Sequence, residues 1–66
     1  MNNENYICAE MSAQNLASEC AKMRGLYIAD ALKPTIANYI HEDALRYLED
    51  IASDFGYTLT PKETKE

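Results

Sequence analysis

Glycine and proline, the residues on which most turns depend, occur only twice each in the 66 residues of the chain. So few turn formers argue against a fold of many short strands and favour a small number of long helices. A chain of this length forms at most one small domain. Its core is expected to be marginal, because such a domain buries only about 60% of the surface that its unfolded chain exposes.

Basic residues are few and scattered. Six Lys and Arg stand against eleven Asp and Glu, which gives a net charge of −5. Phosphate binding requires a concentrated positive surface, so we do not expect nucleic acid as a partner. A helix lying on a membrane needs a basic polar face, and a spanning helix needs about 18 apolar residues in a row; the sequence has neither. The first residues lack the pattern of a secretory signal, so we expect a cytoplasmic protein.

The chain has two cysteines and one histidine. If Cys8 and Cys20 share a helix, they lie about 18 Å apart along its axis, whereas a disulfide needs Cα atoms within about 7 Å. We therefore expect two free, buried or half-buried thiols in a reducing compartment. No closely spaced cysteine pair or histidine pair is present, so we expect no metal and no cofactor.

The clearest pattern in the sequence lies between Pro34 and Gly56. Apolar residues recur there every three or four positions, which places them on one side of a helix. These residues are Ala37, Ile40, Ala44, Leu48, Ile51 and Phe55, and Tyr47 widens the apolar side. Proline is favourable in the first turn of a helix, and glycine is typical of the position just after its end. The pattern predicts a helix over about 35–55.

A second periodic pattern precedes Lys33. Apolar residues alternate in steps of three and four over three heptads, at Tyr6, Ala9, Ala13, Leu16, Cys20, Met23 and Tyr27. This is the spacing of a helix that packs along one seam. We predict a helix over about 5–32 that continues through Gly25, although glycine inside a helix costs about 1 kcal/mol relative to alanine. A break at Gly25, and a separate strand or turn before Ser12, remain alternatives.

The short connection at Pro34 predicts an antiparallel hairpin of these two helices; a single helix kinked at Pro34 is the alternative. The fold class is therefore all-α, with a single domain over 1–61 and a flexible tail over 62–66. The apolar side chains are too many for one shared interface, so we expect a homodimer that resembles a four-helix bundle. The residues predicted to form the core or the dimer interface are Leu16, Met23, Tyr27, Ile40, Tyr47, Leu48, Ile51 and Phe55.

Catalytic patterns are missing. His41 is the only histidine, and its neighbours one helical turn away offer neither a nucleophile nor a group that would orient a general base. The chain has no glycine-rich phosphate loop and no nucleophile elbow. We therefore predict that the protein is not an enzyme and has no catalytic residue.

Acidic residues fill the polar side of the second predicted helix. Arg46 lies four residues from both Glu42 and Asp50, which predicts ion pairs within the helix. An acidic surface favours a basic surface on a partner protein. The predicted partner-binding residues are Glu42, Glu49, Asp50 and Asp54. The sequence thus predicts a small acidic helical module, a regulator or adaptor that binds a further protein.

One alternative function is a dimeric DNA-binding repressor or antitoxin of the ribbon-helix-helix kind. Proteins of that kind have a short strand, a helix, a turn that contains glycine and a second helix. The sequence fits this order with a strand at 6–9, a helix at 12–24, a turn at Gly25 and a following helix. The proposed strand lacks a basic side chain for a DNA groove, and Pro34 comes early in the second helix. A strand or a helix at residues 5–10 would discriminate between the two functions.

Overall fold

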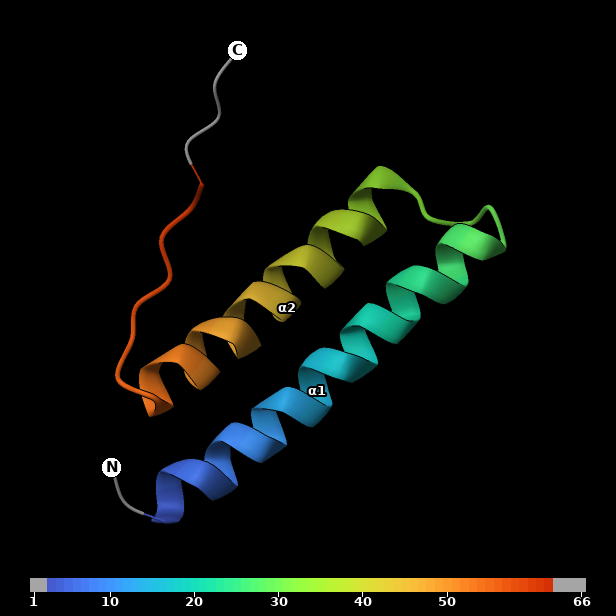
Figure 1. Ribbon diagram of the computed structural model, residues 1–66. Coiled ribbons are helices and arrows are strands. Elements are labelled where there is room, and N and C mark those ends of the chain that lie inside the picture. The colour runs from blue at the N-terminus through green and yellow to red at the C-terminus, as the bar shows by residue number, and fades with distance from the viewer. Residues whose placement is uncertain (1–2, 63–66) are drawn as a thin grey trace.

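The computed structural model describes residues 3–62 as two helices joined by a short turn (Figure 1). Helix α1 spans Asn3–Ile28 and helix α2 spans Pro34–Asp54. The two helices run antiparallel and pack side by side, which confirms the all-α hairpin. The molecule measures 43 × 31 × 15 Å. Because one helix with its side chains is about 10–12 Å wide, the hairpin is a single layer of helices.

Helix α1 passes unbroken through Gly25 and ends at Ile28, four residues before the predicted end at Leu32. The amide of Ala31 donates a hydrogen bond to the Leu26 carbonyl at 2.8 Å, and the amide of Asp30 donates to the Tyr27 carbonyl at 3.1 Å. This is a Schellman motif, with Asp30 in the left-handed conformation at φ 57°. The sequence has no glycine at this position, which is why the periodic pattern suggested a longer helix.

Helix α2 begins and ends within one residue of the predicted range. Lys33 before it is extended, with φ −83° and ψ 151°, as expected for a residue that precedes proline. At the other end Gly56 has φ 85°. Its amide donates to the Ser53 carbonyl at 3.0 Å, and that of Tyr57 donates to the Ala52 carbonyl at 2.8 Å, so a second Schellman motif ends the helix.

The termini of the predicted domain fall partly outside the structure. Residues 1–2 and 63–66 lie outside the described residues, so of the predicted tail only Lys62 is placed, in a segment without helix or strand. Residues 57–62 leave the end of α2 as an extended chain (Figure 1).

The contact between the helices is narrow. Within residues 3–62, Ala9 and Ile40 are the most buried hydrophobic residues, at 6% and 7% exposure. On α1 the buried and half-buried residues follow each other in steps of three and four. They are Asn5, Ala9, Ser12, Leu16, Glu19, Met23 and Leu26. This inner face of α1 carries polar residues at every second position until Leu26.

The inner face of α1 differs from the predicted seam at four of its seven positions. Leu16 and Met23 belong to both, but Tyr27 is 75% exposed. The structure buries or half-buries Ser12, Glu19 and Leu26 and leaves Ala13, Cys20 and Tyr27 exposed. Leu26 at the end of this face is half-buried, as are Ala31 and Leu32 between the two helices.

On α2 the residues that face α1 are again spaced by three and four. They are Ala37, Ile40, Ala44, Tyr47 and Ile51, all buried or half-buried. Leu48 and Phe55 are exposed to more than a third of their surface. These two predicted interface residues therefore lie beside the interhelical contact, and Tyr47 lies within it.

Candidate functional site: two interaction surfaces

Large apolar side chains gather on one flank of the hairpin. The rings of Tyr6 and Phe55 lie 6.2 Å apart at an angle of 55°, so this side of α1 and this side of α2 meet. Leu45 and Leu48 precede Phe55 by ten and seven positions, which places all three on the same side of α2. All four side chains are exposed. We call Tyr6, Leu45, Leu48 and Phe55 the apolar flank.

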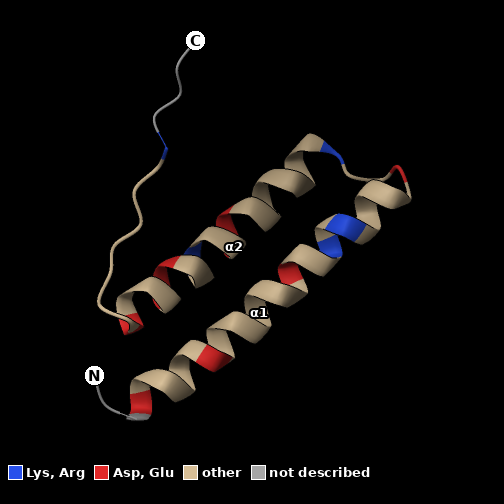
Figure 2. Ribbon diagram, in the orientation of Figure 1, with Lys and Arg blue, Asp and Glu red and all other residues tan. Residues whose placement is uncertain are grey.

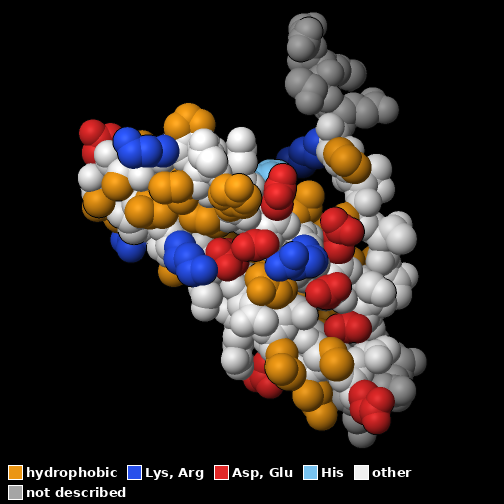
Figure 3. Space-filling model, turned by 180° about the vertical axis from the view of Figure 1, so that it is seen from behind, with side chains coloured by type: hydrophobic (Ala, Val, Ile, Leu, Met, Phe, Trp, Pro, Cys, Tyr) orange, Lys and Arg blue, Asp and Glu red, His pale blue; other side chains and the backbone are white. Residues whose placement is uncertain are grey.

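Three of the predicted partner-binding residues form an acidic surface on α2 that adjoins Leu45 and lies away from Leu48 and Phe55. Glu42 and Glu49 are seven residues apart and so project to the same side, with Asp50 next to them, and all three are exposed. Figure 2 shows acidic residues along α2 and toward its C-terminal end. Figure 3 shows acidic side chains gathered on one face, with apolar side chains exposed toward both ends. We call Glu42, Glu49 and Asp50 the acidic surface.

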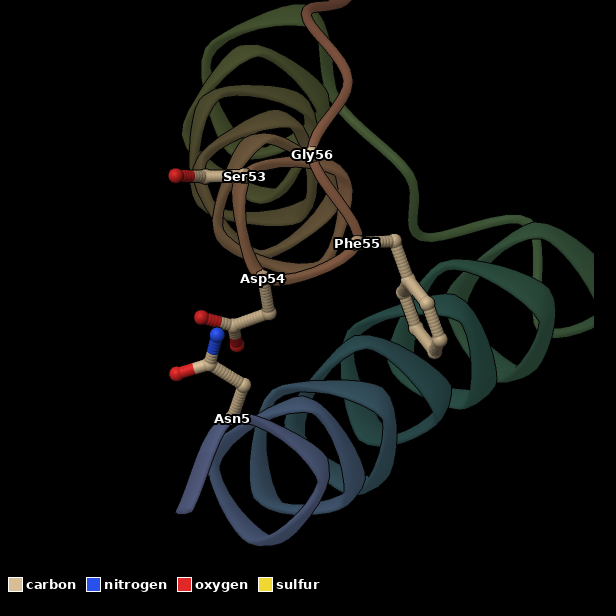
Figure 4. A pocket seen from close by; sticks show the side chains of 5 residues that line it. All are labelled: Asn5, Ser53, Asp54, Phe55 and Gly56. Atoms are coloured by element: carbon tan, nitrogen blue, oxygen red, sulfur yellow. The ribbon is translucent and has the colours of Figure 1, made fainter. Parts of the chain in front are cut away.

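The fourth predicted residue, Asp54, lies apart from the acidic surface. It is half-buried at the end of α2. Its carboxylate points toward Asn5 of α1, across an open pocket that Ser53, Phe55 and Gly56 also line (Figure 4). Asp54 therefore belongs to the contact between the helix ends rather than to the outer surface of α2.

Arg46 forms a different ion pair from the predicted ones. Its guanidinium donates a hydrogen bond to Asp43 Oδ1 at 3.1 Å and lies 5.5 Å from the centre of the Tyr47 ring. Within residues 3–62, Glu42, Glu49 and Asp50 take part in no ion pair. Within the described residues, no Lys or Arg side chain therefore pairs with the carboxylates of the acidic surface.

Glu19 is the residue that the sequence analysis missed. It is 7% exposed and lies on the inner face of α1, although it is charged. Lys22 Nζ donates to its two carboxylate oxygens at 3.1 and 3.4 Å. The lysine side chain is 61% exposed and that of Glu19 only 10%. Ser12, Glu19 and Leu26 are spaced by seven residues, which is the spacing of a helix face that packs against another helix. Because Ser12 and Glu19 are polar, the sequence pattern did not identify this face as the packed one.

The cysteines and the histidine, which were considered as possible metal ligands or catalytic residues, form no common site in the described residues. Cys8 and Cys20 are free and exposed, which corrects the expectation that they are buried. His41 is exposed as well. Within residues 3–62 no three His, Cys, Asp or Glu side chains come close enough to hold a metal ion. Neither described helix combines the length and apolar character that crossing a membrane requires.

No protein-family model, curated protein or solved structure matches the chain. Its function must therefore be inferred from its own surfaces, and the two that the fold assembles are the apolar flank and the acidic surface.

Proposed function

We propose that the protein is a small acidic helical interaction module, a regulator or adaptor that dimerises and binds another protein. The observation that carries the proposal is the surface that the hairpin leaves uncovered. Its accessible surface is 5686 Å², against about 4,200 Å² for a compact monomer of this mass. Its radius of gyration is 14.1 Å, against about 11 Å for a compact domain of this length.

The single layer of helices and the extended chain after α2 both contribute to this excess. Stable domains bury their apolar faces between at least two layers of secondary structure, and the hairpin supplies one. Twelve large hydrophobic residues are exposed within residues 3–62, which is far more than scattered surface positions account for. A second hairpin would supply the missing layer, and the product would resemble a four-helix bundle.

The acidic surface supports binding of a further protein. Glu42 and Glu49 lie roughly a third of a turn around α2 from Leu48 and Phe55 but next to Leu45. Covering Leu48 and Phe55 therefore leaves these carboxylates open, with Leu45 at the border between the two surfaces. Exposed acidic groups without a cation partner attract a basic surface and raise the rate of encounter with it. The partner that fits is therefore a protein with a basic, solvent-exposed patch.

The DNA-binding alternative gains no support. Residues 6–9, which would form its strand, belong to helix α1. The basic residues of the described chain lie mainly near the turn, and acidic residues lie among them (Figure 2). A duplex would meet more negative than positive charge on this surface.

A comparative pull-down from native cells tests the proposal. The bait is the full chain, either native or with Glu49→Gln and Asp50→Asn. The matched control carries Glu4→Gln and Asp30→Asn, which change the net charge equally but lie outside the acidic surface. We expect the first variant, but not the control, to capture less of the same partner and to show a weaker dependence on salt. Equal capture by all three baits would count against the acidic surface.

Sedimentation equilibrium tests the dimer separately. We expect a species of twice the chain mass at micromolar concentration. A well-folded monomer at high micromolar concentration would refute the homodimer.

A further inference from the structure

One flank of α1, about 100° around the helix from its inner face, has a regular composition of its own. Glu10, Ala17 and Arg24 recur there every seven residues, and Ala13 and Cys20 lie between them. All five are exposed. The steps of three and four residues are those of a helix-packing seam. We call these five residues the outer seam; Tyr6 and Tyr27, one step beyond either end, extend it.

The two charged residues of the outer seam are placed symmetrically about its centre. Ala17 stands at its centre, with Glu10 seven residues before it and Arg24 seven residues after it. At the two ends, Tyr6 and Ile28 are also equidistant from Ala17, eleven residues to either side. In an antiparallel pair of α1 helices centred on Ala17, Glu10 of one copy therefore lies opposite Arg24 of the other. In the same pair, Tyr6 lies opposite Ile28.

We propose that a second copy of the chain docks on this seam, with the two α1 helices antiparallel about a two-fold axis at Ala17. The proposal rests on the self-association proposed above and specifies its geometry. The interface is isologous, so every contact between the two chains occurs twice.

The charges select the antiparallel orientation. Within residues 3–62 neither Glu10 nor Arg24 takes part in an ion pair. In the antiparallel dimer Glu10 of each copy lies opposite Arg24 of the other. In a parallel dimer Glu10 would face Glu10 and Arg24 would face Arg24, and such like-charge contacts oppose association.

The small residues at the centre allow the helices to approach. Ala13, Ala17 and Cys20 project little from the helix surface, so the axes can reach the short end of the 8–10 Å range of packed helices. The larger side chains, Tyr6 and Tyr27, lie at the ends of the contact, where they can pack against the aliphatic residues of the second copy. Gly25 lies off this seam and is not required for it.

The same axis also covers the apolar flank. The contact between Tyr6 and Phe55 fixes the register of two antiparallel helices with equal rise per residue, so Ala17 lies level with about residue 44 of α2. The axis therefore brings Leu45 of one copy near residue 43 of the other. Helix α2 then packs beside the second α2, and the two hairpins form two layers.

Charge-swap variants test the pairing by sedimentation equilibrium, with helicity measured by circular dichroism as a check on folding. We expect Glu10→Arg alone to raise the dimer dissociation constant about tenfold or more, because both ion pairs become repulsive. Arg24→Glu alone should do the same. Glu10→Arg combined with Arg24→Glu should return the constant to within about threefold of native. Failure of the double variant to recover while it remains helical would overturn the pairing.

Cysteine cross-linking tests the register in a Cys8→Ser, Cys20→Ser background. Ala17→Cys should form a disulfide between two copies, because the axis brings the two Cα atoms within bonding range. Ala13→Cys should not cross-link with itself, since its two copies lie about 12 Å apart along the axis. It should cross-link when mixed with Ala21→Cys, which stands opposite.

The outcomes separate this inference from the proposed function. Self-cross-linking of Ala13→Cys in a protein that sediments as a dimer would overturn the antiparallel geometry and leave the homodimer intact. A monomer at all concentrations would overturn both the geometry and the homodimer. Partner capture by the acidic surface is measured independently in the pull-down.

Discussion

Replacing Glu19 with leucine should stabilise the protein. The residue lies on the inner face of α1 with only 7% exposure, so its carboxylate is largely removed from water. Its one ion pair is with Lys22, whose side chain is mostly solvated. A charge in this position loses hydration and gains little in return, because an ion pair with an exposed partner contributes only a few tenths of a kcal/mol.

The magnitude follows from burial. A leucine side chain gains about 1.5–3 kcal/mol when it is fully buried, and the two residues have similar helix propensities. After subtraction of the lost ion pair, we expect a net gain of about 1–2 kcal/mol in the free energy of unfolding. That is a large fraction of the roughly 3–10 kcal/mol expected for a domain of this length. Replacement of a partly buried ion pair by an apolar residue is often stabilising for the same reason.

Urea unfolding, followed by circular dichroism at one fixed protein concentration, measures the effect. With an m value of about 1 kcal/mol per molar urea, the midpoint should rise by about 1–2 M. Glu42→Leu, on the exposed side of α2, is the matched control and should change stability by less than about 0.5 kcal/mol. A lower midpoint for Glu19→Leu, or an equal rise for Glu42→Leu, would refute the reasoning.

The remaining predictions also concern stability and use the same unfolding assay. Gly25→Ala should stabilise by about 0.5–1 kcal/mol, because Gly25 lies inside α1 and an added Cβ would have no atom within 4 Å. Gly56→Ala, where the space is equally open but φ is 85°, should destabilise by about 1 kcal/mol; the same sign at both glycines would contradict the backbone explanation. Ile40→Ala should cost about 2–4 kcal/mol because Ile40 is the most buried residue of α2, and a loss below 1 kcal/mol would show that the interhelical contact is not the core.

The helices themselves were predictable because their causes are local. Pro34 and Gly56 bound α2 within one residue of the predicted range, since proline suits a first turn and glycine suits a left-handed end. The end of α1 was less predictable, because Asp30 takes the conformation that glycine usually takes. Of the acidic residues, three share the predicted outer side of α2, and Asp54 does not because the last turn of α2 brings it against Asn5.

The sequence alone determined that the chain forms two helices separated at Lys33 and Pro34. The tertiary structure decided that they form a hairpin rather than a single kinked helix. Only the tertiary structure decided which side of α1 faces α2. Leu16 and Met23 fit two heptad seams that differ by one residue, and one residue turns a helix by about 100°. Because α1 carries apolar side chains on more than one side, its periodicity cannot choose between these seams; the packing against α2 does. This arrangement buries Glu19, exposes Tyr27 and leaves the residues of the outer seam of α1 exposed.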